Sequence, residues 1–564
     1  MKAVSVLTSR RSLPVLLELD LTRGLLETPP ASPLEAARQR HMPVLRVVIS
    51  MLRKAAEDDH VVGLVAHIAA KQPTLAQSSE LRDSVAAFRA AGKATVCWTE
   101  SFGEMQPGNV AYHLASAFEQ IWLQPSGDVG LTGVVGEAVF VHDALDKLGI
   151  GVQIGQRYEY KTAANTFLES GMTTAHKEMA ERLVASSMDT VVADVAQGRG
   201  LSVTAVRDAV EHAPLGATEA QERGLVDRVG YRGDVYTSLR ERLGDTDTRF
   251  LHRYRKGITH LVANIADNPP TIGRPTKPVV AVVSVSGAIH LGRSGSSPFG
   301  GPSIGSQTLA ALLRHAAADD AVRAVVLRVD SPGGSYAASD AIRDEVLALR
   351  SAGRLVVASM GSVAGSGGYY ISMPADVIVA NPGTLTGSIG VLAGKLVFHD
   401  ALDRIGLHRE AVGVGTYAEM FSSNRPYTDD EWARMEAWLD KVYADFTTKA
   451  AADRRLGLAE LQEVARGRVW TGADAQERGL VDELGGLDHA VDVACDRAGL
   501  RRADVVVKVL PKRNPIQRLR PAQNSDSPAA SAALSPLNGG ATLLQTLGVT
   551  SYGVLTMPVV WRIG

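Results

Sequence analysis

The sequence contains two related copies of one long unit. The nine residues Val141–Gly149 return as Phe398–Gly406, so that residue 142 corresponds to residue 399, 257 positions later. Further along, the run Ala220–Asp227 returns as Ala475–Asp482. A repeat of this length predicts that one fold is built twice. Positions that are alike in both copies are most simply scaffold, and a reactive residue present in only one copy becomes a candidate for chemistry.

Length and charge limit the possible classes of protein. At 564 residues the chain is long enough for two domains of about 250 residues each. Its 59 Lys and Arg residues are balanced by 61 Asp and Glu residues. Binding to a nucleic-acid backbone needs a basic surplus, so nucleic acid is not an expected partner. Its two cysteines, Cys97 and Cys495, fall at non-equivalent places in the copies, which favours a reducing compartment or simple disuse over a disulfide framework.

Neither end of the chain has the pattern of a membrane-spanning helix. The first 24 residues carry charges before any long apolar run develops, so no signal peptide or spanning helix is predicted there. The end of the chain is more apolar but contains Pro558, which leaves membrane-surface contact and a packed or frayed tail as alternatives. We therefore expect a cytoplasmic or peripherally membrane-associated protein.

Each copy alternates short apolar runs with segments of helical period. Buried strands are predicted at Val15–Leu21 and Val279–Val285. Further strands are predicted at matched places in the two copies: Ala94–Trp98 with Leu355–Ser359, and Gln120–Leu123 with Val377–Ala380. This alternation predicts an α/β fold built in tandem, with parallel sheets and crossover helices.

Composition suggests where the units begin and end. The stretch from Asp245 to Pro278, which contains Asn268-Pro269-Pro270, joins the copies. Residues 511–540 are rich in Pro, Ser, Ala and Asn and are expected to be disordered. The expected organisation is an N-terminal repeat over 1–265, a linker over 266–278, a C-terminal repeat over 279–505, the disordered stretch, and an apolar tail over 541–564.

A glycine turn follows a strand in the second copy. The predicted strand Val325–Val329 runs into Asp330-Ser331-Pro332-Gly333-Gly334-Ser335. Adjacent glycines at the end of a strand let backbone N–H groups face a ligand, as an oxyanion hole or a phosphate cradle requires. The lysine of a nucleotide-binding P-loop is missing, which argues against ATP. A tight turn without chemistry is the alternative.

Further along, Ser366 stands among glycines in Gly365-Ser366-Gly367-Gly368-Tyr369. A serine at a strand-to-helix junction exposes its Oγ and places the next N–H beside the reacting carbon. The alternative is an N-cap serine of the following helix. Alignment of Tyr112 with Tyr369 places Asn109 opposite Ser366, so the first copy lacks the hydroxyl.

A serine nucleophile needs a base, and the histidines of the second copy do not offer one. His399 has a twin in His142, and His408 stands alone, so we interpret these side chains as structural. The sequence shows no cluster of histidines and carboxylates with metal-ligand spacing, and we expect neither a metal nor a cofactor.

The first copy supplies a lysine that the second copy lacks. Lys161 follows Tyr160, and alignment of Tyr160 with Tyr417 places Ala418 opposite Lys161. A lysine can act as a general base where burial lowers its pKa from about 10.4 toward neutrality. An exposed loop lysine is the alternative for this residue taken alone. The complementary loss of serine and lysine predicts one active site that both copies build.

These residues resemble the long, duplicated form of the signal peptide peptidase A family, also called protease IV. The resemblance covers nearly all of residues 1–500 and rests on the serine and glycine motifs above together with Tyr160-Lys161-Thr162-Ala163, Leu385-Thr386-Gly387-Ser388-Ile389-Gly390 and Val469-Trp470-Thr471-Gly472. It implies a Clp-protease-like or crotonase-like fold and a Ser–Lys dyad peptidase, with Ser366 as nucleophile and Lys161 as general base.

The resemblance also implies the surroundings of the dyad. It makes Ser388 a hydrogen-bond partner of Lys161, with a plain turn serine as the alternative. It places oxyanion donors at Gly367 and at Gly333 or Gly334. Similar proteins form ring- or bowl-shaped oligomers, which implies a homo-oligomer, a tetramer by likeness, that admits short or unfolded peptides such as cleaved signal peptides. Members of this length usually begin with a membrane anchor, and this sequence does not show one.

The predicted function is therefore an ATP-independent serine endopeptidase. Two alternatives belong to other classes. A crotonase-type hydratase or isomerase acting on acyl-CoA would need a carboxylate base and a basic surface for the CoA phosphates. A catalytically inactive scaffold would bind peptides without cleaving them.

Overall fold

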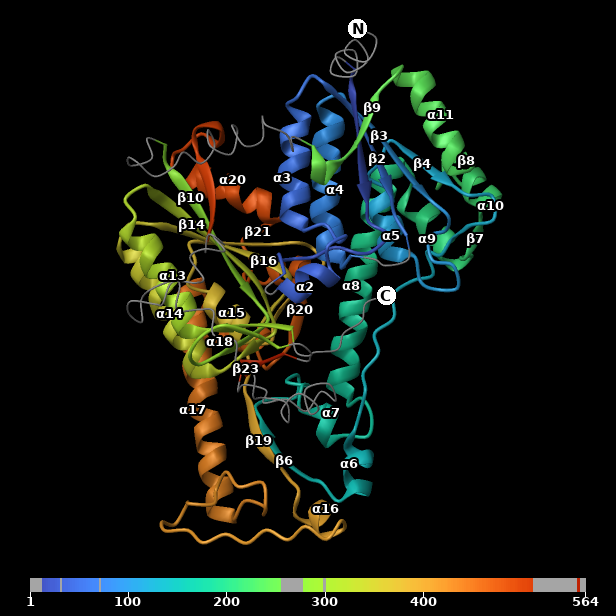
Figure 1. Ribbon diagram of the computed structural model, residues 1–564. Coiled ribbons are helices and arrows are strands. Elements are labelled where there is room, and N and C mark those ends of the chain that lie inside the picture. The colour runs from blue at the N-terminus through green and yellow to red at the C-terminus, as the bar shows by residue number, and fades with distance from the viewer. Residues whose placement is uncertain are drawn as a thin grey trace.

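The computed structural model describes residues 13–30, 33–69, 73–254, 277–297, 301–510 and 555–557. Two α/β repeats lie side by side in it, one coloured blue to green and the other yellow to red (Figure 1). The expected disordered stretch 511–540 lies outside the described residues. So do the linker, apart from residues 277 and 278, and the apolar tail, apart from Leu555–Met557.

The N-terminal repeat is built on a parallel sheet in the order β8-β4-β3-β2-β1-β9. Its strands are β1 (Val15–Asp20), β2 (Val61–His67), β3 (Ala94–Thr99), β4 (Gln120–Leu123), β8 (Arg228–Val229) and β9 (Asp247–Phe250). Because β9 pairs with β1, the residues just after Asp245 belong to this sheet, within the expected N-terminal repeat of residues 1–265.

The C-terminal repeat has the same strand order, β21-β17-β16-β14-β10-β22, and its pairs are also parallel. Its strands are β10 (Val279–Ser286), β14 (Val322–Ser331), β16 (Leu355–Gly365), β17 (Val377–Ala380), β21 (Glu483–Leu484) and β22 (Val506–Leu510). Each of the six strands predicted in pairs is present. The tandem α/β fold with parallel sheets is confirmed.

Helices connect the strands and bury apolar runs. The N-terminal repeat contains α3 (Leu45–Ala56), α4 (Leu75–Ala90), α5 (Asn109–Ala115), α9 (Val203–Glu211) and α11 (Arg232–Leu243), and the C-terminal repeat contains α13 (Ser306–Ala318), α14 (Tyr336–Ser351), α15 (Gly367–Ser372), α18 (Leu458–Val464) and α20 (Leu487–Arg497). In β10, for example, Val280, Ala281 and Val283 are all fully buried. Strands covered on both faces explain why the sequence shows continuous apolar runs instead of alternation.

Two matched helices and a small ladder extend below the sheets (Figure 1). The helices are α8 (Thr174–Arg199) and α17 (Asp429–Arg454), each of 26 residues. The ladder pairs β6 (Gly151–Gln156) of the first repeat antiparallel with β19 (Leu392–Val397) of the second. The ladder brings together the segment that precedes Lys161 and the segment that follows Ser388.

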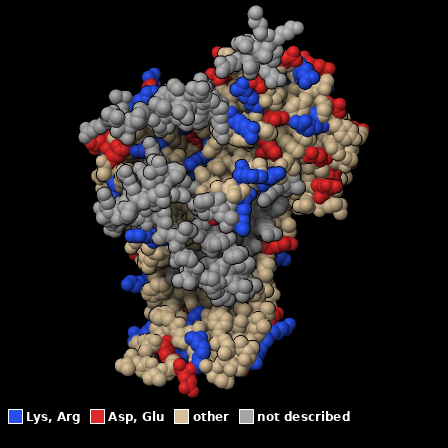
Figure 2. Space-filling model, in the orientation of Figure 1, with Lys and Arg blue, Asp and Glu red and all other residues tan. Residues whose placement is uncertain are grey.

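The surface carries charges of both signs, interspersed on the face shown in Figure 2. At the end of the molecule that holds the ladder, several large apolar side chains after α16 (His399–Asp403) are exposed: Ile405, Leu407, Val412, Val414 and Phe421. Within the described ranges, none of the helices combines the length and the apolar character needed to cross a bilayer.

Candidate active site

Ser366 occupies a strained turn between a strand and a helix. β16 ends at Gly365 and α15 begins at Gly367, and Ser366 between them has φ 53° and ψ −113°. Positive φ is costly for a residue with a Cβ and persists only where the surroundings enforce it. Here the Ser366 N–H donates to the carbonyl of Gly387 over 2.8 Å. The side chain makes no capping hydrogen bond to α15, so the N-cap alternative does not describe it.

Lys161 reaches this serine from the other repeat. Its Nζ lies 2.9 Å from Ser366 Oγ and 3.0 Å from both the carbonyl oxygen and the Oγ of Ser388. Lys161, Ser366 and Ser388 are all fully buried. The structure thus brings together, within one chain, the serine and the lysine that the copies carry separately, and it excludes the exposed-loop alternative for Lys161.

Glycines of the C-terminal repeat make room for the lysine. A Cβ on Gly467 would lie 2.6 Å from both the Cβ and the N of Lys161, and a Cβ on Gly390 would lie 3.1 Å from its Cδ. Gly467 also has φ +81°, which an L side chain rarely adopts. Its N–H donates to the carbonyl of Ile389 over 2.8 Å, which ties this loop to the segment after Ser388.

Burial controls the charge of the lysine. Removal from water lowers the pKa of Lys161 well below its ordinary value of 10.5, because the charged ammonium loses its hydration. The three contacts of Nζ are two hydroxyls and one carbonyl. A neutral amine matches this set, with two N–H donors for Ser388 and a lone pair for the Ser366 hydroxyl.

The glycine turn lies next to the residue that follows Ser366. Gly333 (φ +100°) and Gly334 form β15, and a Cβ on Gly367 would lie 3.0 Å from Gly334 N and 3.1 Å from Gly333 Cα. The three glycines predicted as oxyanion donors are therefore neighbours. The Gly333 N–H already donates to Ser331 Oγ over 3.2 Å, a contact that the sequence does not reveal.

The equivalent place in the N-terminal repeat has become structural. Asn109 begins α5, just as Ser366 immediately precedes α15. Its Nδ2 donates to the carbonyl of Gly133 over 2.8 Å, and its Oδ1 accepts from the Gly133 N–H over 3.1 Å. Ala418, which the alignment places opposite Lys161, is exposed. The first copy therefore holds an amide that fastens a loop where the second copy holds the serine.

A Ser–His–Asp arrangement in the N-terminal repeat was not visible in the sequence. Ser78 Oγ lies 2.7 Å from His113 Nδ1, and His113 Nε2 lies 2.7 Å from Asp194 Oδ2. Ser78 and His113 are fully buried. Burial lowers the pKa of His113 to about 4. These hydrogen bonds join α4, α5 and α8.

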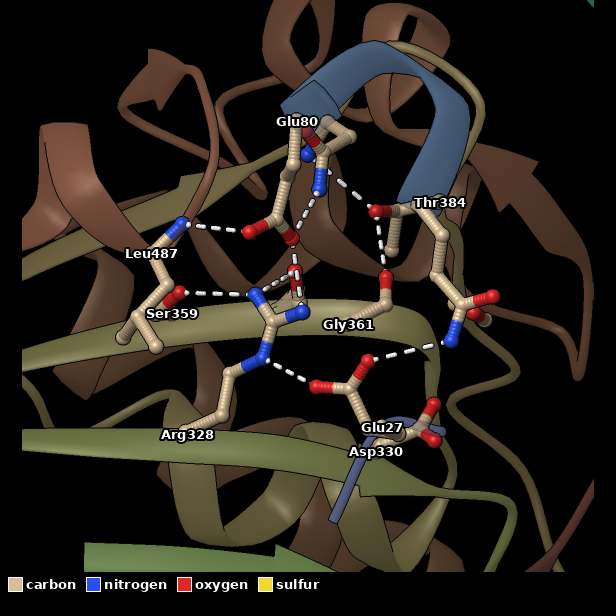
Figure 3. A network of polar contacts seen from close by, with 12 residues as sticks. Glu27, Glu80, Arg328, Asp330, Ser359, Gly361, Thr384 and Leu487 are labelled. Atoms are coloured by element: carbon tan, nitrogen blue, oxygen red, sulfur yellow. Dashed lines mark hydrogen bonds and ion pairs between the residues drawn. The ribbon is translucent and has the colours of Figure 1, made fainter. Parts of the chain in front are cut away.

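A buried charge network joins the two repeats near the site (Figure 3). Arg328 of β14 donates to Glu27 over 2.8 Å and to Glu80 over 2.6 Å, both carboxylates belonging to the N-terminal repeat. Glu80 also accepts from the Leu487 N–H over 3.1 Å. Asp330, on the same strand, accepts from the Val363 N–H over 3.1 Å, just before Ser366 in β16. Burial raises the pKa of Asp330 to about 6.

The histidines singled out in the sequence lie away from the dyad. His142 Nδ1 lies 3.1 Å from the carbonyl of Phe167, and His399 Nε2 lies 3.4 Å from Asp403 within the same helix. His408 Nδ1 lies 3.0 Å from Asp403 as well. In the part of the chain that the structure describes, no group of three or more His, Cys, Asp or Glu side chains could hold a metal ion.

Comparisons with known proteins agree with the duplicated architecture. Residues 87–245 and 348–501, one stretch in each repeat, match the model of Peptidase family S49. Protease 4 of Salmonella typhi is 32% identical over 468 residues, which cover 81% of this chain and 72% of that protein. The chloroplastic serine protease SPPA of Arabidopsis thaliana is 30% identical over 452 residues, covering 79% of this chain and 64% of that protein.

Among solved structures, a variant of the membrane-bound stomatin-specific protease 1510-N matches with a TM-score of 0.27 and 15% identity, over 42% of this chain and 98% of its own. The sequence relatives and the two family matches confirm the resemblance to protease IV. These relatives and family matches do not favour the alternative of a crotonase-type hydratase or isomerase acting on acyl-CoA. The chain belongs to Peptidase family S49 and is a serine peptidase.

Proposed function

We propose that the chain is an ATP-independent endopeptidase whose nucleophile is Ser366 and whose general base is Lys161. In the free enzyme the neutral amine of Lys161 accepts the hydrogen bond of the Ser366 hydroxyl. Ser388 positions the amine by accepting its two N–H groups at the carbonyl oxygen and at Oγ. The Gly367 N–H and an N–H from Gly333 or Gly334 face the oxygen that becomes negative.

The reaction then proceeds through an acyl-enzyme. Ser366 Oγ bonds to the peptide carbonyl carbon while its proton moves to Lys161 Nζ. Collapse of the tetrahedral intermediate breaks the C–N bond, and the ammonium returns the proton to the departing amine. Water then attacks the ester carbon as Lys161 takes its proton. The C–O bond breaks while the ammonium returns that proton to Ser366 Oγ, which releases the acid and restores the hydroxyl and the neutral amine.

One observation carries the proposal. A fully buried lysine amine lies 2.9 Å from the hydroxyl of a serine held at positive φ. Burial of the Lys161 amine and strain at Ser366 both cost free energy. Strained residues and perturbed pKa values are concentrated at functional sites. Among the residues that the structure describes, the contacts of Nζ include no carboxylate that would keep the amine charged.

The substrates proposed are short or unfolded peptides, including cleaved signal peptides. Apolar side chains from both repeats form a cluster near the serine that suits apolar peptide side chains: Met179, Leu183, Leu385 and Val469. We further propose that the chain assembles as a homo-oligomer, a tetramer by its resemblance to the family, and that it contacts membranes peripherally.

Labelling with a fluorophosphonate probe tests the dyad. The wild-type chain is expected to form a covalent adduct that mass spectrometry places on Ser366, because only a base-activated serine reacts quickly. The variant Lys161→Met is expected to lose labelling while its circular dichroism stays unchanged. The matched control is Lys177→Met, since that lysine is exposed and is expected to leave labelling intact. Equal labelling of wild type and Lys161→Met would contradict the dyad.

A further inference from the structure

A segment near the C-terminal end of the chain lies against the glycine turn of the site. β23 (Leu555–Thr556) pairs antiparallel with β15 (Gly333–Gly334). The Met557 N–H donates to the carbonyl of Pro332 over 2.9 Å. Addition of an extended peptide to a strand is a common way in which proteins bind peptides. The segment therefore adds to the turn as an extended strand.

The side chains of Leu555 and Met557 are buried. Leu555 is 0% and Met557 1% exposed. A Cβ added to Gly365, the residue before Ser366, would overlap Met557 Sδ. Met557 packs with residues drawn from both repeats: Met179, Leu183, Leu385 and Val469, with Tyr160 and Val363 at the edge. Its side chain thus fills an apolar site that both repeats form around the dyad.

The regular pairing between the segment and the glycine turn ends at Met557. In a regular antiparallel pair, the residue opposite Met557 would donate an N–H to its carbonyl, but Pro332 has no N–H. Gly367 is the first residue of α15, so its N–H has no acceptor within that helix. The residue opposite Met557 in the turn therefore offers no N–H to its carbonyl.

We propose that residues 555–557 are a built-in competitor for the substrate site, with Met557 in the place of the side chain next to the scissile bond. This inference rests on the proposed function, because it assigns the occupant of that site. Pro558 follows in the sequence and confines Met557 to extended backbone, which favours pairing with β15. Tethering gives such a segment an effective concentration of about the millimolar range, so that even weak contacts compete with free peptides.

Competition of this kind has a defined kinetic signature. A substrate binds only those molecules whose site is not occupied by the segment. The segment therefore raises KM and leaves kcat unchanged. If the segment occupies nine sites in ten, its release lowers KM about tenfold.

The test compares full-length variants in the hydrolysis of a fluorogenic apolar peptide. Met557→Asp and Leu555→Asp each place a charge in a buried apolar site and are expected to lower KM by about 3- to 10-fold with unchanged kcat. The matched control is Met105→Asp, because Met105 is 97% exposed. The control is expected to keep the wild-type KM. A wild-type KM in both tail variants would overturn the proposal.

A second measurement separates this inference from the proposed function. The rate of fluorophosphonate labelling at Ser366 is expected to be higher in Met557→Asp, and a synthetic peptide of residues 551–560 is expected to slow it again. If no variant labels, the dyad itself fails. If wild type and variant label at one rate, only the tail proposal fails. The labelling rate of Met557→Asp divided by that of the wild type is measured at several protein concentrations. A ratio that does not depend on concentration supports a segment from the same chain, and a ratio that grows with concentration contradicts it.

Discussion

At the scale of single residues, the charge state of Lys161 links activity to stability. In the unfolded chain this lysine has a pKa near 10.5, and burial lowers that pKa in the folded chain. Below the folded pKa folding buries the charged ammonium, and between the folded pKa and 10.5 folding expels a proton; both cost free energy. The cost shrinks as the pH rises from the folded pKa toward 10.5, where the unfolded chain also loses its proton.

We therefore predict that Lys161→Met is inactive yet more stable than the wild type at neutral pH. Methionine fills a similar volume and needs no proton exchange on folding. The loss in kcat/KM is expected to be about 10³-fold or more. Calorimetry from pH 6 to pH 10 measures the difference in Tm, which should narrow with increasing pH. A difference that widens with pH would show that burial does not lower the pKa of this lysine.

The pH profile of the enzyme offers a second prediction. The value of kcat/KM should rise with pH as Lys161 loses its proton, with a midpoint below 10.5, because only the neutral amine can accept the Ser366 proton. Ser388→Ala removes an acceptor that favours the charged amine, so the midpoint should move to lower pH. It should also reduce the plateau by about 10- to 100-fold through loss of positioning.

The control for this measurement is Ser362→Ala. Ser362 Oγ contacts Thr74 Oγ1 over 2.7 Å across the repeats and has no contact with the lysine. Both the midpoint and the plateau should stay at their wild-type values. An unchanged midpoint in Ser388→Ala would restrict Ser388 to a structural role.

At the scale of secondary structure, the strands were predicted well and the loops of the site were not. Continuous apolar runs such as Val279–Val285 identify buried parallel strands because both faces of the sheet are covered. Comparison of the copies identified Ser366 and Lys161, since each reactive side chain is missing from one copy. Ser388 followed only from the resemblance. Gly467 carried no signal beyond a glycine before Val469, because its need for a small residue arises from a lysine 306 positions earlier in the chain, at 161 against 467.

The close approach at Gly467 can be tested directly. Gly467→Ala would place its Cβ 2.6 Å from Lys161 and should displace the amine. A displacement of about 1 Å predicts a loss of about 100-fold in kcat/KM. The matched control is Gly353→Ala, because Gly353 has φ +74° but open space around it. The control should lose about 1 kcal/mol of stability and keep its activity. Equal activity of both variants would contradict the steric account.

At the scale of the whole molecule, the site depends on how the repeats are held together. Glu80 and Arg328 are buried and Glu27 is partly buried where the repeats meet, and none of these residues belongs to a repeated motif. Sequence reasoning could not find this network, since its members are distant in the chain and share no periodicity. The tail strand beside β15 was missed for the same reason.

Substitution of Arg328, the cation of this network, should weaken the contact between the two repeats. Arg328→Met leaves Glu27 and Glu80 buried without their partner and should destabilise the chain by about 3–5 kcal/mol. Denaturant unfolding measures this loss, and kcat/KM should fall with it. Arg207→Met is the control, because its partner Asp189 and Arg207 itself are about half exposed. Its effect should stay below about 1 kcal/mol. Similar values for both variants would show that the network does not hold the repeats.

The division of the dyad between the repeats also matters during synthesis. Lys161 precedes Ser366 by 205 residues, so a ribosome adds the serine roughly 10 to 40 s after the lysine. Throughout that interval the nascent chain contains the amine of the proposed dyad but not its serine. With the proposed dyad, hydrolysis is therefore expected to begin only after the C-terminal repeat has been synthesised and has folded against Lys161.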